Sequence, residues 1–310
     1  MHHFTRKKLS SSSASAERLK KEQDYYYLKN GSSVLEELLA LCDGNCRIPI
    51  RYFSGTEIDR ATDHSAKNIE LADARASMFT DSLDNRLVLI RFSHHFYGVH
   101  RDIAVTSQMS HLKNVLRLVG CCLEFEKPVM VYEYVEAINL DELLFNKARK
   151  SLLSWGSRLR IAKEVASAVV FPHTEFTTPI IHRTICPSNV IIDQNNGVAK
   201  LVDFSLSLSL PPGKLEVQDL LAGRIGYVDH EYFRTRKILL LMDHVMDIAD
   251  PAILEEHRIE IRQQLEDYLD LVKICTLSKG EDRPYMIHVA RELRQIEKCF
   301  RALSVVAHEN

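Results

Sequence analysis

The most informative absences in this 310-residue sequence concern glycine, long apolar runs and net charge. No glycine lies between Gly55 and Gly98, so this stretch lacks the residue that lets backbone amides approach a phosphate closely. The longest aliphatic run covers residues 238–242 and is far too short to cross a bilayer. With 40 basic and 42 acidic residues the formal charge is −2, which gives no electrostatic basis for binding nucleic acid or an anionic membrane.

Disulfide, metal and targeting signals are also missing. The seven cysteines are scattered, with no pair of CxxC motifs and no Cys/His cluster, which indicates reduced intracellular thiols rather than disulfides or zinc. His94 and His95 have no third ligand nearby, so they are interpreted as solvated imidazoles. There is no secretory apolar region, and His2 stands where N-myristoylation requires glycine. These features favour a cytoplasmic protein.

Composition divides the start of the chain into two segments. Residues 1–30 are basic, serine-rich and charged, which predicts a disordered arm, with partner binding or phosphorylation as the alternative. Residues 31–64 are predicted to form a helical extension. Its first helix begins at Ser33, three residues before Glu36 as in a capping box, and stops at Gly44. Its predicted apolar face consists of Leu35, Leu38, Leu39 and Cys42.

The second predicted helix of this extension has the clearer start signal. Ser54 and Glu57 have the spacing of a capping box, in which each residue satisfies the other's backbone amide. Phe53 and Ile58 occupy the two positions of a hydrophobic staple around the same helix start.

The remaining chain changes from a β-rich to a helical pattern, which predicts an α+β fold. Strands are expected at 86–92 and 128–135, a helix at 102–109 and a bent strand pair around Gly120 at 115–125. After Trp155 a helical period follows until Pro172. A hairpin then joins strands 190–192 and 199–202 through the turn at 195–197, and two apolar helical stripes follow at 261–272 and 286–296. Residues 301–310 are predicted to be a tail.

The segment between residues 180 and 209 carries two degenerate catalytic motifs. His182-Arg183-Thr184 with Asn189 five positions later matches H-R-D-x-x-x-x-N, and Asp203-Phe204-Ser205 matches D-F-G. Thr184 stands where the carboxylate base belongs, and a neutral hydroxyl does not accept a proton near pH 7. These substitutions indicate a catalytic loop that retains its architecture without its base.

Several further motifs, taken together, are typical of one protein family. They are Tyr52-Phe53-Ser54, Gly120-Cys121-Cys122-Leu123-Glu124, Val131-Tyr132-Glu133-Tyr134, Pro187-Ser188-Asn189, Gly226-Tyr227-Val228-Asp229 and Arg283-Pro284-Tyr285-Met286. With these motifs the chain resembles plant receptor-like cytoplasmic kinases, and more narrowly the pseudokinases related to wall-associated kinases, over roughly residues 50–300. The resemblance implies a two-lobed protein-kinase-like domain over 65–300, with a β-rich N-lobe at 65–135 and a helical C-lobe at 136–300.

The resemblance also implies positions for a degenerate nucleotide site. Arg91 stands at the position of the strand lysine, and Asp102 resembles the position of the helix-C glutamate. The two either tie the lobes together or form a weak surface pair. Asn189 and Asp203 stand at the two magnesium positions. Cys186 replaces the catalytic-loop lysine. Without a glycine-rich loop over 68–78, which is interpreted as a plain strand turn, ATP is not expected to bind in the usual way.

Other motif residues are expected to be structural. They are His182, Arg183, Phe204, and the buried pair Glu231 and Arg283. Ser205 adds a Cβ where the family motif has glycine, which favours one fixed state of the backbone.

One departure from the family is larger than a substitution. The chain passes from Tyr232 to Asp250 in eighteen residues, with no D-V-Y-S-F-G-like motif. The sequence therefore predicts a deletion of the central C-lobe helices, with residues 238–248 either forming a substitute helix or leaving an open apolar face.

The combined prediction is a pseudokinase that recognises proteins and transfers no phosphate. The family resemblance implies an adaptor or decoy in plant intracellular immune signalling. The expected partners are a nucleotide-binding leucine-rich-repeat (NLR) immune receptor and other receptor-like cytoplasmic kinases, through which the protein reaches the plasma membrane peripherally. No cofactor is expected. Two alternatives stay open: a weak ATP-binding serine/threonine kinase, and a degenerate paralogue without function.

Overall fold

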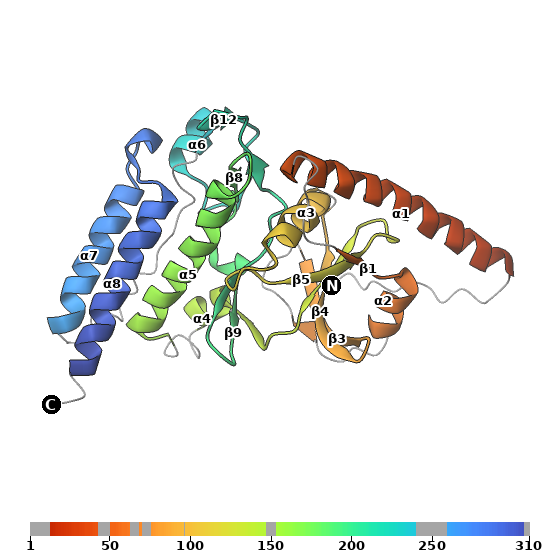
Figure 1. The fold of residues 1–310 in the computed structure, drawn as a ribbon, viewed down its shortest axis with the longest axis horizontal. Helices are drawn as coiled ribbons and strands as arrows, with labels where there is room; N and C mark the ends of the chain where they lie inside the picture. The colour runs from red at the N-terminus through yellow and green to blue at the C-terminus, as the bar shows by residue number, and fades with distance from the viewer. Residues whose placement is uncertain are drawn as a thin grey trace.

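The computed structural model describes residues 13–42, 50–62, 68–69, 76–95, 97–146, 153–239 and 259–306. A sheet-rich lobe lies beside a helical lobe, and the helices α5 (Trp155–Thr174), α7 (Ile259–Cys275) and α8 (Met286–Val306) stand together at the end away from the sheet (Figure 1). This arrangement confirms the predicted α+β fold with two lobes.

The N-lobe is built on a six-stranded sheet that begins earlier in the chain than residue 65. Its edge strand β1 pairs in parallel with β5, so part of the predicted helical extension belongs to the sheet. The strand order across the sheet is β1 (Arg51–Tyr52), β5 (Leu118–Cys122), β6 (Val129–Glu133), β4 (Arg86–Ser93), β3 (Ala76–Leu83) and β2 (Asn68–Ile69). Residues 70–75, within the segment interpreted as a strand turn, lie outside the described residues.

Strand β5 corrects the predicted bent strand pair at 115–125. It is a single strand whose pairing register with β6 shifts between Leu118 and Gly120. A Cβ atom on Gly120 would lie 2.4 Å from the carbonyl oxygen of Arg51. The glycine therefore permits the close approach of β1 and does not mark a turn between two strands.

The N-terminal segment is the largest correction to the sequence prediction. Residues 13–42 form one helix, α1 (Ser13–Cys42), so the predicted disordered arm is wrong from Ser13 onward and Ser33 begins no helix. Residues 1–12 and Gly44 lie outside the described residues. Val34 and Leu41 of α1 are almost completely buried, in the N-lobe and C-lobe cores respectively. These tertiary contacts stabilise a helix that the local pattern predicts only from Ser33 onward.

Polar contacts fix α1 onto the N-lobe beside α3 (Val99–Met109). Asn30 is 1% exposed, and its Nδ2 donates to the carbonyl oxygens of Leu123 at 2.9 Å and Phe125 at 2.8 Å. Its Oδ1 lies 2.9 Å from Nε2 of His100 on α3. The predicted apolar face of α1 is split, because Leu38 and Cys42 pack against the core while Leu35 and Leu39 are exposed.

The second helix confirms its predicted start. Helix α2 (Gly55–Thr62) is preceded by Ser54, whose backbone amide donates to Oε2 of Glu57 at 2.7 Å, while Ser54 Oγ accepts from the Glu57 amide at 3.3 Å. Hydrogen bonds from the Ser54 backbone and hydroxyl lower the pKa of Glu57 below its ordinary value. Phe53 and Ile58 are buried in one cluster, as the staple predicts.

The C-lobe begins with α4 (Leu140–Phe145) and α5 and carries a three-stranded sheet. Strand β9 (Val190–Asp193) lies between β7 (Ala137–Asn139) and β10 (Ala199–Leu201). The turn at 195–197 joins β9 to β10 as predicted, with Gly197 at a φ of 69°. Helix α5 does not end at Pro172, because the proline lies buried in the last turn and the helix continues to Thr174.

The late C-lobe differs from the sequence prediction in two places. Strands β12 (Glu216–Gln218) and β13 (Lys237–Leu239) pair antiparallel, with α6 (His230–Thr235) between them in the chain. The predicted substitute helix at 238–248 therefore begins as a strand, and residues 240–258 lie outside the described residues. Helix α8 extends to Val306, so the predicted tail is helical over its first part. Among the helices described, none has the length and apolar character of a membrane span.

We expect Asn30→Ala to lower the free energy of unfolding by about 2 kcal/mol, because the carbonyl oxygens of Leu123 and Phe125 each lose a hydrogen bond and the Leu123 bond is buried. Chemical denaturation of the full chain measures this change. Ser32→Ala, on the exposed side of the same helix, serves as the matched control and should change stability by less than about 0.5 kcal/mol. Equal effects of the two substitutions would contradict the integration of α1 into the N-lobe.

Candidate functional site

The degenerate catalytic loop keeps a closely packed backbone. Arg183 and Asp203 both have left-handed backbone conformations, with φ of 70° and 67°, which non-glycine residues adopt rarely. The His182 ring lies 4.6 Å from the Phe204 ring, and its Nε2 lies 3.2 Å from the carbonyl oxygen of Val202. His182 and Phe204 are thus buried packing residues of this loop.

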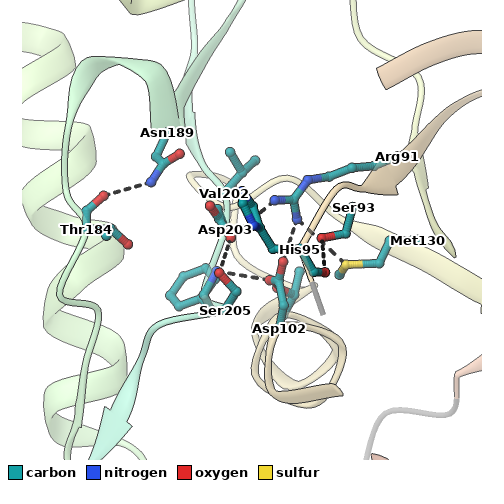
Figure 2. A network of polar contacts seen from close by, with 12 residues as sticks. Arg91, Ser93, His95, Asp102, Met130, Thr184, Asn189, Val202, Asp203 and Ser205 are labelled. Atoms are coloured by element: carbon teal, nitrogen blue, oxygen red, sulfur yellow. Dashed lines mark hydrogen bonds and ion pairs between the residues drawn. The ribbon is translucent and has the colours of Figure 1, made fainter. Parts of the chain in front are cut away.

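Thr184 is buried at the predicted base position. Its Oγ1 lies 3.3 Å from Nδ1 of His182, while its carbonyl oxygen accepts a hydrogen bond from Asn189 Nδ2 at 2.8 Å. Figure 2 shows the Asn189 amide directed at the Thr184 backbone. The Asn189 side chain therefore holds the backbone of the loop in place. At the base position the loop offers a hydroxyl instead of a carboxylate.

The same loop carries a cationic contact that the sequence interpretation missed. Cys186 is buried, with its Sγ 3.2 Å from Ser188 Oγ. The guanidinium Nη1 of Arg224 donates to that same Ser188 hydroxyl. Arg224 stands two residues before the Gly226-Tyr227 motif, but nothing in its local sequence shows that it reaches the loop. Residues 203–235, called the activation segment below, thus place a positive charge against Ser188 of the catalytic loop.

Arg91 of β4 is the centre of the site. Its Nη1 lies 2.5 Å from Oδ2 of Asp102 on α3, and its Nη2 lies 3.2 Å from Oδ1 of Asp203 (Figure 2). The side chains are 7%, 1% and 4% exposed. The predicted Arg91–Asp102 pair therefore forms in the interior and is no surface pair. One guanidinium joins the sheet, the helix and the segment after the hairpin.

Further hydrogen bonds complete the coordination of the two carboxylates. Asp102 Oδ1 accepts from the Phe204 amide at 3.0 Å and from Thr106 Oγ1 at 2.9 Å. Asp203 Oδ1 accepts from Ser205 Oγ at 2.6 Å. Ser205 thus forms a hydrogen bond that the glycine of the family motif does not offer, which holds Asp203 in one position.

The pKa values of the two carboxylates shift in opposite directions, although both carboxylates pair with Arg91. Burial raises the pKa of Asp102, although Arg91 acts in the opposite direction. Burial also disfavours ionised Asp203, but Arg91 and the Ser205 hydroxyl outweigh it and lower the pKa of Asp203. Desolvation opposes the charge of Arg91 as well, and the two carboxylates outweigh this effect and raise its pKa. The charged state of the cluster therefore depends on Arg91.

Close backbone packing holds α3 against this cluster. Gly98 precedes α3 with a φ of 76°, and a Cβ there would lie 1.9 Å from the carbonyl oxygen of Ser205. Arg101 adds side-chain contacts, since its Nη1 pairs with Glu37 of α1 at 3.0 Å and its Nη2 donates to Ser209 at 2.5 Å. Neither the Gly98 contact nor the bridge from Arg101 was predicted, because both join segments far apart in sequence.

The second predicted pair has a different principal partner. Arg283 is buried, and its Nη1 pairs closely with Asp229, whereas Glu231 Oε2 lies 4.0 Å from its Nη2. Glu231 Oε2 accepts instead from the Gly280 amide. The activation segment is thus joined to the late helices, as the resemblance implies, but mainly through a carboxylate that the sequence interpretation left out.

The predicted magnesium positions fit a metal ion poorly. Oδ1 of Asp203 already accepts from Ser205 and pairs with Arg91, and a neighbouring guanidinium repels a divalent cation. In the part of the chain that the structure describes, no three His, Cys, Asp or Glu side chains gather as a metal site would require.

Comparisons with known proteins agree with the geometry. Residues 93–238 match the family model described as protein tyrosine and serine/threonine kinase. The chain is 34% identical to the serine/threonine-protein kinase ZRK1 of Arabidopsis thaliana, over 87% of this chain and 92% of the relative. It is 35% identical to the non-functional pseudokinase ZED1 of the same plant, over 87% and 96%. Identity to its wall-associated receptor kinase-like 1 is 28%, over 89% and 44%.

We expect Arg91→Ala to destabilise the protein by about 3 kcal/mol or more, because two buried carboxylates would lose their shared cation. Urea denaturation measures the loss. Adding Asp102→Asn to Arg91→Ala should recover part of the stability, since it removes one of the two negative charges.

The matched control for this pair of variants is Arg86→Ala, which removes an exposed arginine from the same strand. It should leave stability within about 0.5 kcal/mol of the unsubstituted protein. The losses of unfolding free energy in Arg91→Ala and in Asp102→Asn are compared with the loss in the double variant. If the two single losses add up to the double one, the two side chains are not coupled.

Proposed function

Because the chain belongs to the protein-kinase family, in the group of the Arabidopsis ZRK kinases and the ZED1 pseudokinase, we propose that it is a catalytically inactive pseudokinase that acts by binding proteins. The observation that carries this proposal is Thr184, a buried hydroxyl at the base position of an otherwise well-packed loop. Proton transfer from a substrate hydroxyl has no acceptor at that position.

The Arg91 cluster supports a scaffold that needs no nucleotide. In an active kinase, the strand lysine and the D-F-G aspartate serve the phosphates and the magnesium ions. Here Arg91 pairs directly with both Asp102 and Asp203, so the protein supplies its own cation between them. The arrangement of β4, α3 and the segment after the hairpin therefore persists without Mg·ATP.

Exposed apolar side chains on α1 support a protein-binding role. Leu28, Leu35 and Leu39 are 69%, 56% and 52% exposed, and their spacing of seven and four residues places them on one side of the helix. Such a stripe on a helix that is fixed to the N-lobe suits recognition by another protein. Following the family resemblance, we propose an adaptor in plant immune signalling, located in the cytoplasm, that binds an NLR immune receptor and related kinases.

A weak kinase is the second candidate function, and one observation favours it. Asn189 and Asp203 are both present at the magnesium positions of the loop, and the relative ZRK1 is named a serine/threonine-protein kinase. Under this alternative, Arg91 would leave Asp203 when nucleotide binds.

Thermal denaturation with and without Mg·ATP distinguishes the two functions. We expect the melting temperature to stay unchanged up to millimolar nucleotide, since a ligand that binds only the folded state would raise it in a saturable way. We also expect no phosphate transfer to a general substrate, even from the Thr184→Asp variant. In that variant Arg91 still pairs with the Asp203 carboxylate, the position that holds magnesium in kinases. Saturable stabilisation together with phosphate transfer would support the weak kinase, and the absence of a cooperative transition would indicate the degenerate paralogue.

For the adaptor role, we expect the full chain to co-purify with a leucine-rich-repeat immune receptor when both are expressed in plant tissue. Replacing Leu28 and Leu35 with serine should reduce the recovered receptor at least several-fold. Leu87→Ser on β4 is the matched control, because Leu87 has the same 56% exposure as Leu35. Recovery that is equal for all three proteins would exclude the α1 stripe as the receptor contact.

A further inference from the structure

Arg183 of the catalytic loop contacts two separate parts of the activation segment, residues 219–220 and Tyr232. Its Nη1 pairs with Asp219 Oδ2 at 2.8 Å, and its Nη2 donates to the Leu220 carbonyl at 2.7 Å and to the Tyr232 hydroxyl at 2.6 Å. The Arg183 side chain is only 8% exposed. One buried guanidinium therefore joins the catalytic loop to the residues after β12 and to helix α6.

The Tyr232 hydroxyl connects the same two parts a second time. It donates to the Leu220 carbonyl and accepts from the Ala222 amide at 3.0 Å. Asp219 is also joined to the end of α6, since its amide donates to the Arg236 carbonyl at 3.1 Å. Residues 219–222 thus form a small hydrogen-bonded unit with α6, and the carboxylate of Asp219 joins this unit to Arg183.

Activation segments of kinases are commonly ordered by a phosphate that pairs with arginine. A phosphate provides up to two negative charges and several acceptor oxygens, but it must be added and removed by enzymes. In this protein a carboxylate of the chain itself meets the arginine. We propose that Asp219 is a permanent counterion of Arg183 that keeps residues 216–235 ordered without phosphorylation.

The simpler alternative is that Arg183 and Asp219 form an ordinary surface ion pair. Such pairs contribute little, because both side chains remain hydrated. Asp219 is 35% exposed, but Arg183 is buried and its other two contacts converge on the same segment. Removing the carboxylate would leave a buried guanidinium without this counterion, which costs more than the loss of a surface pair. The Lys237–Glu216 pair of β13 and β12, 42% and 52% exposed, is the true surface pair of this segment.

Hydrogen–deuterium exchange on the unphosphorylated full chain tests the proposal. Residues 216–235 should be protected in the unsubstituted protein, and Asp219→Asn should speed their exchange about tenfold, as expected for loss of a hydrogen bond between charged groups. Asp219→Glu should restore most of the protection, because it returns the charge. Glu216→Gln is the control with the same charge change, and it should leave exchange nearly unaltered.

Exchange in α5 and α8, which lie outside residues 216–235, reports whether a variant is folded. Faster exchange confined to 216–235 is a local effect, whereas faster exchange in α5 and α8 as well is a global loss of structure. Unchanged exchange of 216–235 in Asp219→Asn would overturn the proposal. So would protection in protein purified from plant tissue that disappears on phosphatase treatment. None of these measurements depends on whether the chain transfers phosphate, so the result stands apart from that of the nucleotide experiments.

Discussion

The buried contact of Arg91 with Asp102 and Asp203 is the interaction on which the rest of the site depends. A guanidinium offers several donors in a fixed plane, so it can hold two carboxylates from different elements at once. Once α3 is held against β4 in this way, Arg101 is placed to reach both α1 and the segment after the hairpin. Because single removal of a buried charge is costly, the position of α3 and the conformation around Asp203 are coupled.

This interaction stabilises the fold at the position where a kinase would hold its nucleotide. A lysine is a compact cation on a flexible chain that serves the phosphates, whereas Arg91 forms its contacts within the protein. The Ser205 hydroxyl acts in the same direction, since it donates to the carboxylate that would otherwise bind metal. A metal ion at Asp203 would therefore have to displace the contacts of its Oδ1 with Arg91 and Ser205.

Local signals predicted structure where neighbouring residues alone decide it, and they failed where contacts between distant segments decide it. The capping box at Ser54 and the turn at 195–197 need only neighbouring residues, so both were predictable. The part of helix α1 before Ser33 was missed because its serine-rich, charged sequence is a poor helix signal, and its stability comes from contacts such as those of Asn30. The contacts of Arg224 and Asp219 span 36 residues each, and no periodicity reports on such pairs.

The pattern of retained and substituted motif residues follows from what each side chain contacts. His182 packs on Phe204, Arg183 organises the activation segment, and Asn189 donates to the loop backbone. Each of these roles persists without catalysis. The Thr184 hydroxyl, in contrast, lies 3.3 Å from Nδ1 of His182 in a buried position and joins no other element in the hydrogen bonds described. The loop therefore keeps its shape with Thr184 at the base position, whereas the loss of Arg183 or Asn189 would remove contacts that hold the loop together.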